Sequence, residues 1–200
     1  LWDSTLTTNG SHTLQAEAID KAGNAVRSES IIARVNNNPV IAISVPKNNA
    51  VVGKKIDITF VNKSKVVVNK AEVYVDDSQT PAVVSAVSSL KKISWDTAST
   101  TNGAHSIRLK AYDEFGNFGF SEPVGVMVDN ILPTVGITSP SEGAMVSGAY
   151  VNFSAAASDN IGIRQVRFYI NGRYAKVLYS APYNFSWNST RFINGIYSIY

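Results

Sequence analysis

Hydrophobic and polar residues alternate along most of this chain, and the alternation marks the places where strands should form. Period-2 patterning is clear at residues 56–60, 71–75 and 166–170, where every second side chain is apolar. This pattern is typical of strands that bury one face and leave the other in solvent. No stretch shows the 3.6-residue period of an amphipathic helix. The sequence therefore predicts an all-β fold.

The strand pattern recurs along the chain. Trp2, Trp95 and Trp187 lie 93 and 92 residues apart, and they open the phrases WDSTLTTNGSHTL, WDTASTTNGAHSI and WNSTRFINGIYSI. This period is too long for a solenoid turn and suits a small β-sandwich. We therefore predict that residues 1–37 hold the last third of one repeat, residues 38–130 a complete repeat, and residues 131–200 the first three quarters of another.

Each repeat is expected to begin with an edge strand. In the complete repeat this strand lies between Pro39 and Pro46, and in the third repeat between Pro133 and Pro140. Proline lacks a backbone N–H and is tolerated where a strand has no ladder partner. The next predicted strands are the alternating segments at 56–60 and 71–75, with counterparts at 151–155 and 166–170, and then 90–95.

Two turn signals place the remaining strands. Asn171-Gly172 follows an alternating segment, and this dipeptide predicts a hairpin because both turn residues must take positive φ; the middle repeat has Asp76-Asp77 there. The phrase Asp-x-x-Gly-Asn occurs at Asp20 and at Asp113, and it suits a turn in which the aspartate caps backbone N–H groups. About seven short strands per repeat predict two packed antiparallel sheets.

These phrases resemble the tandem bacterial Ig-like domains of secreted and surface proteins. The resemblance rests on P-x-V-x-I-x-x-P, S-D-N-I-G-I-x-x-V-x-F-Y-I-N-G, A-P-Y-x-F-x-W, N-G-x-H-x-I and A-x-D-x-x-G-N, and it covers essentially the whole chain. It implies tandem immunoglobulin-like β-sandwiches that serve as an extracellular spacer, stalk or adhesive module. The middle repeat departs from the pattern at residues 62–65 and 89–91.

Composition narrows the classes of function. The chain has no cysteine, which excludes disulfides, thiolate metal sites and thiol nucleophiles. The net charge is only +3, and Asp57 and Glu72 lie within the lysine-rich segment 54–72, so we expect no nucleic-acid partner. The apolar runs are far too short to cross a bilayer.

Candidate catalytic groups are few. His12 and His105 occupy one equivalent position, which Tyr197 takes in the third repeat. A general base would not survive this exchange, whereas a flat ring that packs at the start of a strand would. The repeated Asp20 and Asp113 are explained by their turn. We therefore predict no enzyme activity, no catalytic residue and no cofactor.

The sequence also offers candidate ligands for a calcium site at the junction between two repeats. Ca²⁺ takes six or more oxygen ligands, and acidic and amide side chains lie near the boundary between the second and third repeats. The candidates are Asp129, Asn130, Asp159, Asn160 and Glu142. The other boundary reads Asn-Asn-Asn at 36–38 and lacks a carboxylate, so a site of this kind would not repeat with the module.

Aromatic residues raise the question of a sugar-binding surface. The three tryptophans could form a stacking platform, but Ile93 and Phe185 share their strand faces, which favours burial in the core. Tyr74 and Tyr169 point away from the core residues of their strands and are the better candidates for ligand contact. Phe118 and Phe120 are further exposed candidates.

These observations lead to two hypotheses. The first is a structural repeat segment of an extracellular or cell-surface protein or fibre, with hinges at 36–39 and 129–133. The alternative is a carbohydrate- or ligand-binding accessory module, for which surface glycans would be the partners. Residues 1–37 lack the rest of a sandwich and could instead complete a head-to-tail copy. However, residues 187–200 duplicate 2–15, which favours neighbouring repeats on one continuous chain.

Overall fold

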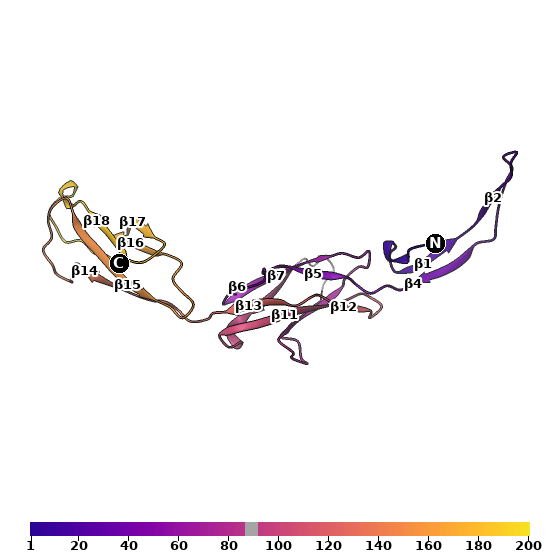
Figure 1. The fold of residues 1–200 in the computed structure, drawn as a ribbon, viewed down its shortest axis with the longest axis horizontal. Coiled ribbons are helices and arrows are strands. Elements are labelled where there is room, and N and C mark those ends of the chain that lie inside the picture. The colour runs from indigo at the N-terminus through magenta and orange to yellow at the C-terminus, as the bar shows by residue number, and fades with distance from the viewer. Residues whose placement is uncertain (87–91) are drawn as a thin grey trace. The chain divides into compact units, whose positions relative to one another are not determined.

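The computed structural model describes residues 1–86 and 92–200 and is all-β apart from short 3-10 turns (Figure 1). The described chain divides into two compact units, Leu1–Asn130 and Ile131–Tyr200. The 3-10 turns are η1 (Ser4–Leu6), η2 (Thr97–Ser99) and η3 (Ser189–Arg191). Each turn begins two residues after one of the three tryptophans. Asp3, Asp96 and Asn188 cap the turns by accepting a hydrogen bond from a backbone N–H.

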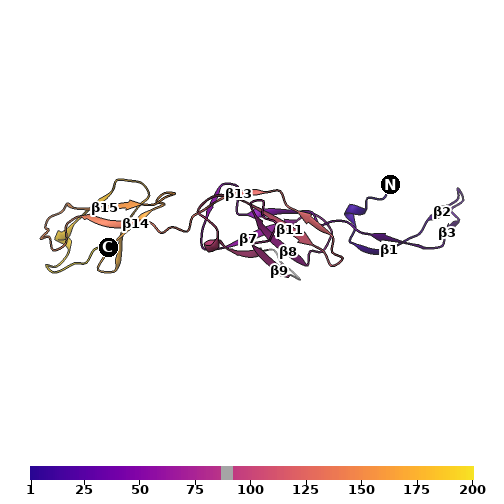
Figure 2. The ribbon, with the colours of Figure 1, turned by 90° about the horizontal axis from the view of Figure 1, so that it is seen from below.

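The middle repeat is a sandwich of two sheets (Figure 2). One sheet has the order β10–β7–β5 and is antiparallel. The other has the order β6–β13–β11–β8–β9, and β12 also pairs with β11. The strands are β5 (Ile41–Val45), β6 (Ala50–Val52), β7 (Lys55–Asn62), β8 (Lys70–Val75), β9 (Val83–Ala86), β10 (Lys92–Asp96), β11 (Gly103–Tyr112), β12 (Phe118–Phe120) and β13 (Val124–Val128).

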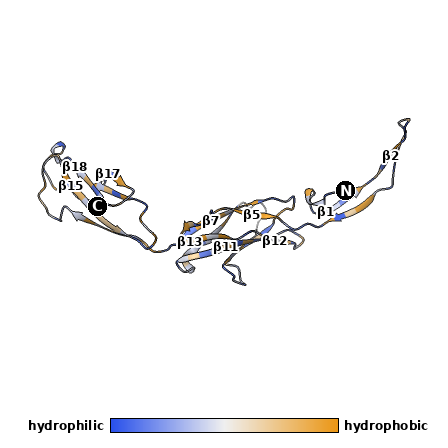
Figure 3. Ribbon diagram, in the orientation of Figure 1, coloured by the Kyte–Doolittle hydropathy of each residue, from blue (hydrophilic) through white to orange (hydrophobic). Residues whose placement is uncertain are grey.

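Apolar side chains from both sheets meet in one core. Ile58 and Trp95 come from the first sheet, and Ile107 and Leu109 come from the second; all four are at most 1% exposed. The period-2 pattern predicts this burial, and Figure 3 shows the hydrophobic positions along these strands. The predicted start of β10 at Leu90 lies outside the described residues.

The opening strand of the middle repeat changes sheets. β5 is at the edge of its sheet, as the flanking prolines predict, and its register shifts between Ile43 and Val45. The chain then crosses over and forms β6, which pairs in parallel with β13. Asn48 Oδ1 and the N–H of Asn49 bond the backbone of Gly125 at 2.9 and 2.8 Å and fix this crossing. The sequence pattern did not predict β6.

The third repeat also begins with an edge strand whose register shifts, between Ile137 and Ser139. Its strands are β14 (Thr134–Ser139), β15 (Val151–Ser158), β16 (Val166–Ile170), β17 (Arg173–Leu178) and β18 (Tyr183–Trp187). β14–β15–β18 form one sheet, and β16 and β17 form the predicted hairpin, in which Asn171 and Gly172 both have positive φ. Phe153, Phe168 and Trp187 lie in the core between them.

Residues 1–37 form a ribbon of paired strands without a facing sheet of their own. β1 (Gly10–Leu14) pairs with β4 (Ile31–Val35), and β2 (Glu17–Ile19) pairs with β3 (Ala25–Arg27). The prediction that Trp2 is buried is wrong, because this side chain is 48% exposed. Trp95 is covered by the opposite sheet of its repeat, and residues 1–37 do not contain that sheet.

Candidate functional site

Two equivalent asparagines, Asn37 and Asn130, bond back to the loop that follows the tryptophan. The N–H of Asn130 donates to Asn102 Oδ1 at 2.7 Å, and Asn130 Nδ2 donates to the carbonyl of Thr97 at 2.9 Å. Asn37 makes the equivalent bonds, to Asn9 Oδ1 at 2.7 Å and to the carbonyl of Ser4 at 2.7 Å. These recurring side chains therefore stabilise the end of the module.

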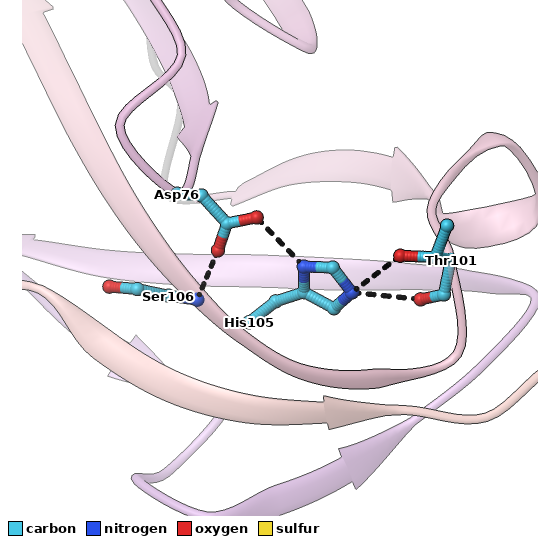
Figure 4. Close-up of polar contacts among 4 residues, drawn as sticks. All are labelled: Asp76, Thr101, His105 and Ser106. Atoms are coloured by element: carbon cyan, nitrogen blue, oxygen red, sulfur yellow. Dashed lines mark hydrogen bonds and ion pairs between the residues drawn. The ribbon is translucent and has the colours of Figure 1, made fainter.

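His105 bridges a loop and a strand end in the middle repeat (Figure 4). Its Nδ1 lies 2.9 Å from Asp76 Oδ2, and its Nε2 lies 2.8 Å from the carbonyl oxygen of Thr101. The other carboxylate oxygen of Asp76 accepts from the N–H of Ser106 at 3.0 Å. Both ring nitrogens face acceptors, an arrangement that suits the doubly protonated imidazolium.

The third repeat makes two of these contacts, those to the carbonyl and to the strand N–H, with uncharged groups. Tyr197 takes the place of His105, and its hydroxyl donates to the carbonyl of Ile193 at 2.9 Å. Asn171 takes the place of Asp76 and accepts from the N–H of Ser198 at 2.7 Å. His12 in the first segment lies 2.8 Å from the carbonyl oxygen of Thr8. In all three copies, the ring at this position therefore bonds the carbonyl oxygen of the residue four positions earlier.

We expect the His105–Asp76 pair to make the stability of the middle repeat depend on pH. Asp76 raises the pKa of His105, so its contribution is complete below the usual value of 6.5 and is lost as pH rises through the folded pKa. Hydrogen bonds from Ser106 and then His105 lower the pKa of Asp76, so its contribution is lost only in acid. Because Asp76 is 55% exposed, solvent screening limits the contribution to roughly 0.5 kcal/mol.

The third repeat supplies the matched variant for this prediction. The double substitution His105→Tyr, Asp76→Asn copies the pair found there and retains hydrogen bonds to Thr101 and Ser106. Thermal unfolding measured between about pH 5 and about pH 8 should show that the wild type loses the stability contributed by the His105–Asp76 pair as the pH rises. The variant should show no such loss. Identical pH profiles for the two proteins would contradict the assignment.

Asp113, the aspartate of the repeated turn, is buried, at 4% exposure. Its Oδ1 accepts from the N–H groups of Phe115 and Asn117 at 2.9 and 2.8 Å, as the predicted turn requires. Its Oδ2 accepts from Asn117 Nδ2 at 2.8 Å and from Asn9 Nδ2 at 2.7 Å. Burial opposes ionisation, but the bonds from Asn117 and Asn9 outweigh it and lower the pKa of this carboxyl.

Tyr74 lies on the outer face of the sheet, as predicted, but it is half-buried. Its hydroxyl donates to Glu72 Oε2 at 2.8 Å, and the hydroxyl of Tyr112 donates to the same oxygen at 2.9 Å. Lys70 pairs with the other oxygen of Glu72 at 2.6 Å. Burial, followed by the bond to Glu72, raises the pKa of Tyr74 to about 12. Tyr74 is therefore part of a polar network of the module itself.

Cations cover the neighbouring exposed rings. Lys110 Nζ lies 4.1 Å from the ring centre of Phe118 and 5.4 Å from that of Phe120. The guanidinium of Arg108 lies 4.6 Å from the ring centre of Phe120. These contacts engage ring faces on which a sugar would stack. Phe118 and Phe120 are 45% and 43% exposed, as the sequence predicted.

Tyr169 is also half-buried, and it lies among other tyrosines. Its ring stacks on Tyr200 with centres 5.6 Å apart and meets the edge of Tyr174 at 6.2 Å. Arg173, Tyr174 and Lys176 line an open hollow of about 870 Å³ together with Trp187. A ligand role for Tyr169 stays a prediction.

Two of the calcium candidates, Asn130 and Asp159, bond groups within their own units. Asn130 Oδ1 accepts from Thr97 Oγ1 at 2.8 Å and from the N–H of Lys54 at 3.1 Å. Asp159 Oδ1 accepts from two backbone N–H groups of its own loop, those of Ile161 and Gly162. The described residues contain no group of three or more His, Asp or Glu side chains placed to hold a metal. Calcium binding at Asp129, Asn130, Asp159, Asn160 and Glu142 remains a prediction.

Two residues of these networks were not predicted from the sequence. Asp76 was assigned only to a turn, although it also bonds His105. The signal was present, because the exchange of His105 for Tyr197 coincides with the exchange of Asp76 for Asn171. Asn9 was likewise not predicted to reach Asp113, although both belong to repeated phrases.

Comparisons with known proteins agree with this architecture. The chain matches the family model described as bacterial Ig domain over residues 39–109 and 133–200. The fibronectin(III)-like modules of Clostridium thermocellum CbhA are 27% identical, with a TM-score of 0.53, over 80% of this chain and 83% of that chain. A tetra-tandem repeat from the extending region of a large adhesion protein is 18% identical, with a TM-score of 0.37, over 96% of this chain and 52% of that chain.

No curated protein matches the chain. In the part of the chain that the structure describes, no helix has the length and apolarity needed to span a bilayer. The family match includes most of the middle repeat and the described strands of the third, which together exceed half of the chain. The sheets and cores described above are those of immunoglobulin-like sandwiches. The chain therefore belongs to the bacterial Ig domain family.

Proposed function

We propose that this chain is a non-enzymatic structural segment of an extracellular bacterial surface protein or fibre, in which tandem repeats act as spacers. In this proposal the repeats meet at residues 37/38 and 130/131, and the partners of each repeat are its neighbours. The proposal rests on one observation above all: the polar side chains that recur from repeat to repeat bond within the array itself. His105, Asp113 and Asn130 each have partners of this kind.

Several features support a mechanical rather than a chemical role. The turn aspartates Asp20 and Asp113 are both engaged with N–H groups of their own turns. The histidine position tolerates tyrosine while keeping its bond to a carbonyl four residues earlier. Residues that serve catalysis could not be exchanged in this way. The recurrence of the tryptophan phrase and of the Asp-x-x-Gly-Asn turn is consistent with stacking of repeats as the function.

The spacer role predicts an elongated particle in solution. A complete repeat adds roughly 30–40 Å, because strands of about ten residues rise about 3.3 Å per residue. A rod of roughly 100 Å has a radius of gyration near 29 Å, whereas a compact body of this length would have one of roughly 17 Å. Small-angle scattering of the 200-residue chain should give a value close to the first. A value close to the second would contradict the proposal.

The contrasting hypothesis is carbohydrate binding at Tyr74 or Tyr169. We expect the wild type to show no saturable binding on a glycan array. Binding that disappears in Tyr169→Ala or Tyr74→Ala, with an unchanged circular dichroism spectrum, would instead support an accessory binding module. Arg173→Ala is a suitable companion variant, because Arg173 pairs with Ile170 in the same hairpin and its replacement removes a charge without removing a ring.

A further inference from the structure

The Asp-x-x-Gly-Asn turn receives side chains from the repeat that precedes it. We propose that this turn is the docking site for that repeat, and that Asn9 and Asn36 hold the preceding repeat against the turn that begins at Asp113. The inference rests on the proposed role as a tandem array and names the contact that would keep successive repeats in register. Its partner is therefore another copy of the same module.

The first contact joins Asn9 to Asp113. Asn9 Nδ2 donates to Asp113 Oδ2 at 2.7 Å and to the carbonyl of Asn37 at 2.8 Å. Asn9 Oδ1 accepts from the N–H of Asn37 at 2.7 Å. This last bond fixes the orientation of the amide, because a flipped amide would place its N–H₂ against another donor. The preceding repeat thus presents a pre-oriented donor to the carboxylate.

Asp113 needs this donor because it is almost fully buried. A buried carboxylate is stable only when its lone pairs accept hydrogen bonds, and bonds to charged groups are among the strongest in proteins. Three of the donors belong to the turn itself, namely two backbone N–H groups and Asn117 Nδ2. The fourth is Asn9, which comes from a different repeat. Loss of Asn9 would leave Oδ2 short of a partner in a dry position.

The linker between the repeats makes the second contact. Asn117 Nδ2 donates to Asn36 Oδ1 as well as to Asp113. Pro39, which is buried, lies against the backbone of Gly119, where an added Cβ would come within 1.9 Å of the Pro39 carbonyl oxygen. The linker therefore lies directly on the strand that follows the turn. Contacts on both sides of the turn restrict rotation about the linker.

Both halves of the contact recur in the sequence. Each tryptophan phrase contains Asn-Gly, at 9–10, 102–103 and 194–195. Gly10 and Gly103 share a positive φ that favours glycine. Asp20 caps its turn as Asp113 does, with Oδ1 accepting from Ala22 and Asn24. The Gly119 position is Val26 in the first segment, so the close approach of the linker is particular to this junction. The Asn–Asp contact is the part that the repeats share.

The absence of cysteine permits a direct test, because two introduced cysteines can be labelled uniquely. Spin labels at Ser11→Cys and Lys55→Cys, both exposed, report the distance between the first segment and the middle repeat. The wild type should give a single narrow distance by double electron–electron resonance. Asn9→Asp keeps the acceptor for Asn37 but opposes two carboxylates, and it should shift the closed-to-open ratio by roughly tenfold or more.

Asn102→Asp is the matched control, because it makes the same change in the same phrase, away from this junction, and keeps the acceptor for Asn130. It should leave the labelled distance unchanged. Asn9→Ala removes the donor without adding charge and should broaden the distance as well. If both Asn9 variants keep the wild-type distance while thermal unfolding shows a folded middle repeat, the docking inference is wrong. If small-angle scattering still gives the radius of gyration of a rod in that case, the spacer role stands. A compact radius of gyration combined with a narrow spin-label distance would reject the spacer role and leave the docking inference in place.

Discussion

Replacement of Trp95 by alanine should destabilise the middle repeat by about 3–5 kcal/mol, a large part of the stability of a domain of this size. The indole is 1% exposed and lies between the two sheets among Ile58, Ile93 and Leu109. Its removal forfeits buried apolar area and leaves a cavity that the surrounding strands can fill only in part. Chemical denaturation of the full chain, followed by far-ultraviolet circular dichroism, measures this loss.

Trp2→Ala is the control that the repeat itself provides. Trp2 occupies the same place in its phrase but is 48% exposed, and its contacts are a 3.3 Å bond to Thr7 and the edge of His12. We expect its replacement to change the free energy of unfolding of the middle repeat by about 0.5 kcal/mol or less. Equal losses in the two variants would mean that Trp95 does not owe its effect to the core between the sheets.

Gly53→Ala should destabilise the same repeat by about 1–3 kcal/mol, because the new methyl group has no room. A Cβ at this position would lie 2.1 Å from the carbonyl oxygen of Asp129, a backbone atom that cannot rotate away. The clash falls beside the bond from the N–H of Asp129 to the carbonyl of Val52, at 2.8 Å. The pairing of β6 with β13 should therefore loosen, and the melting temperature of the middle repeat should fall.

Gly136→Ala tests whether steric conflict is the cause. Gly136 lies in β14, and an added Cβ there would meet no atom within 4 Å. This change should alter the stability of the third repeat by no more than about 0.5 kcal/mol. A wild-type melting temperature for Gly53→Ala would show that the loop between β6 and β7 yields easily and that the close approach is unimportant.

The strands with clear alternation could be predicted from the sequence because the pattern within each strand itself determines which side chains face the core. In β7 and β8 every second residue is apolar, and these residues, including Ile58 and Val73, form the core. The hairpin at Asn171-Gly172 was predicted for a similar reason, since its dihedral angles are set by residue type.

Features that depend on distant partners could not be predicted in this way. β6 is only three residues long, and its place beside β13 follows from the crossing at Asn48 and Asn49 rather than from its own pattern. Trp2 has the sequence context of a core residue, yet it is exposed because residues 1–37 form paired strands with no facing sheet. The Asn9–Asp113 bond joins residues 104 positions apart, and neither phrase alone indicates the other.

The parallel pairing of β6 with β13 determines how a stretching force would act on the middle repeat. β6 lies near the start of the repeat and β13 at its end, and the register pairs Ala50 with Val126 and Val52 with Val128. A pull on the two ends of the repeat therefore displaces these strands lengthwise past each other. The hydrogen bonds between the two strands would bear that shear together instead of opening one after another. β6 would therefore resist separation of the two ends of the repeat under load.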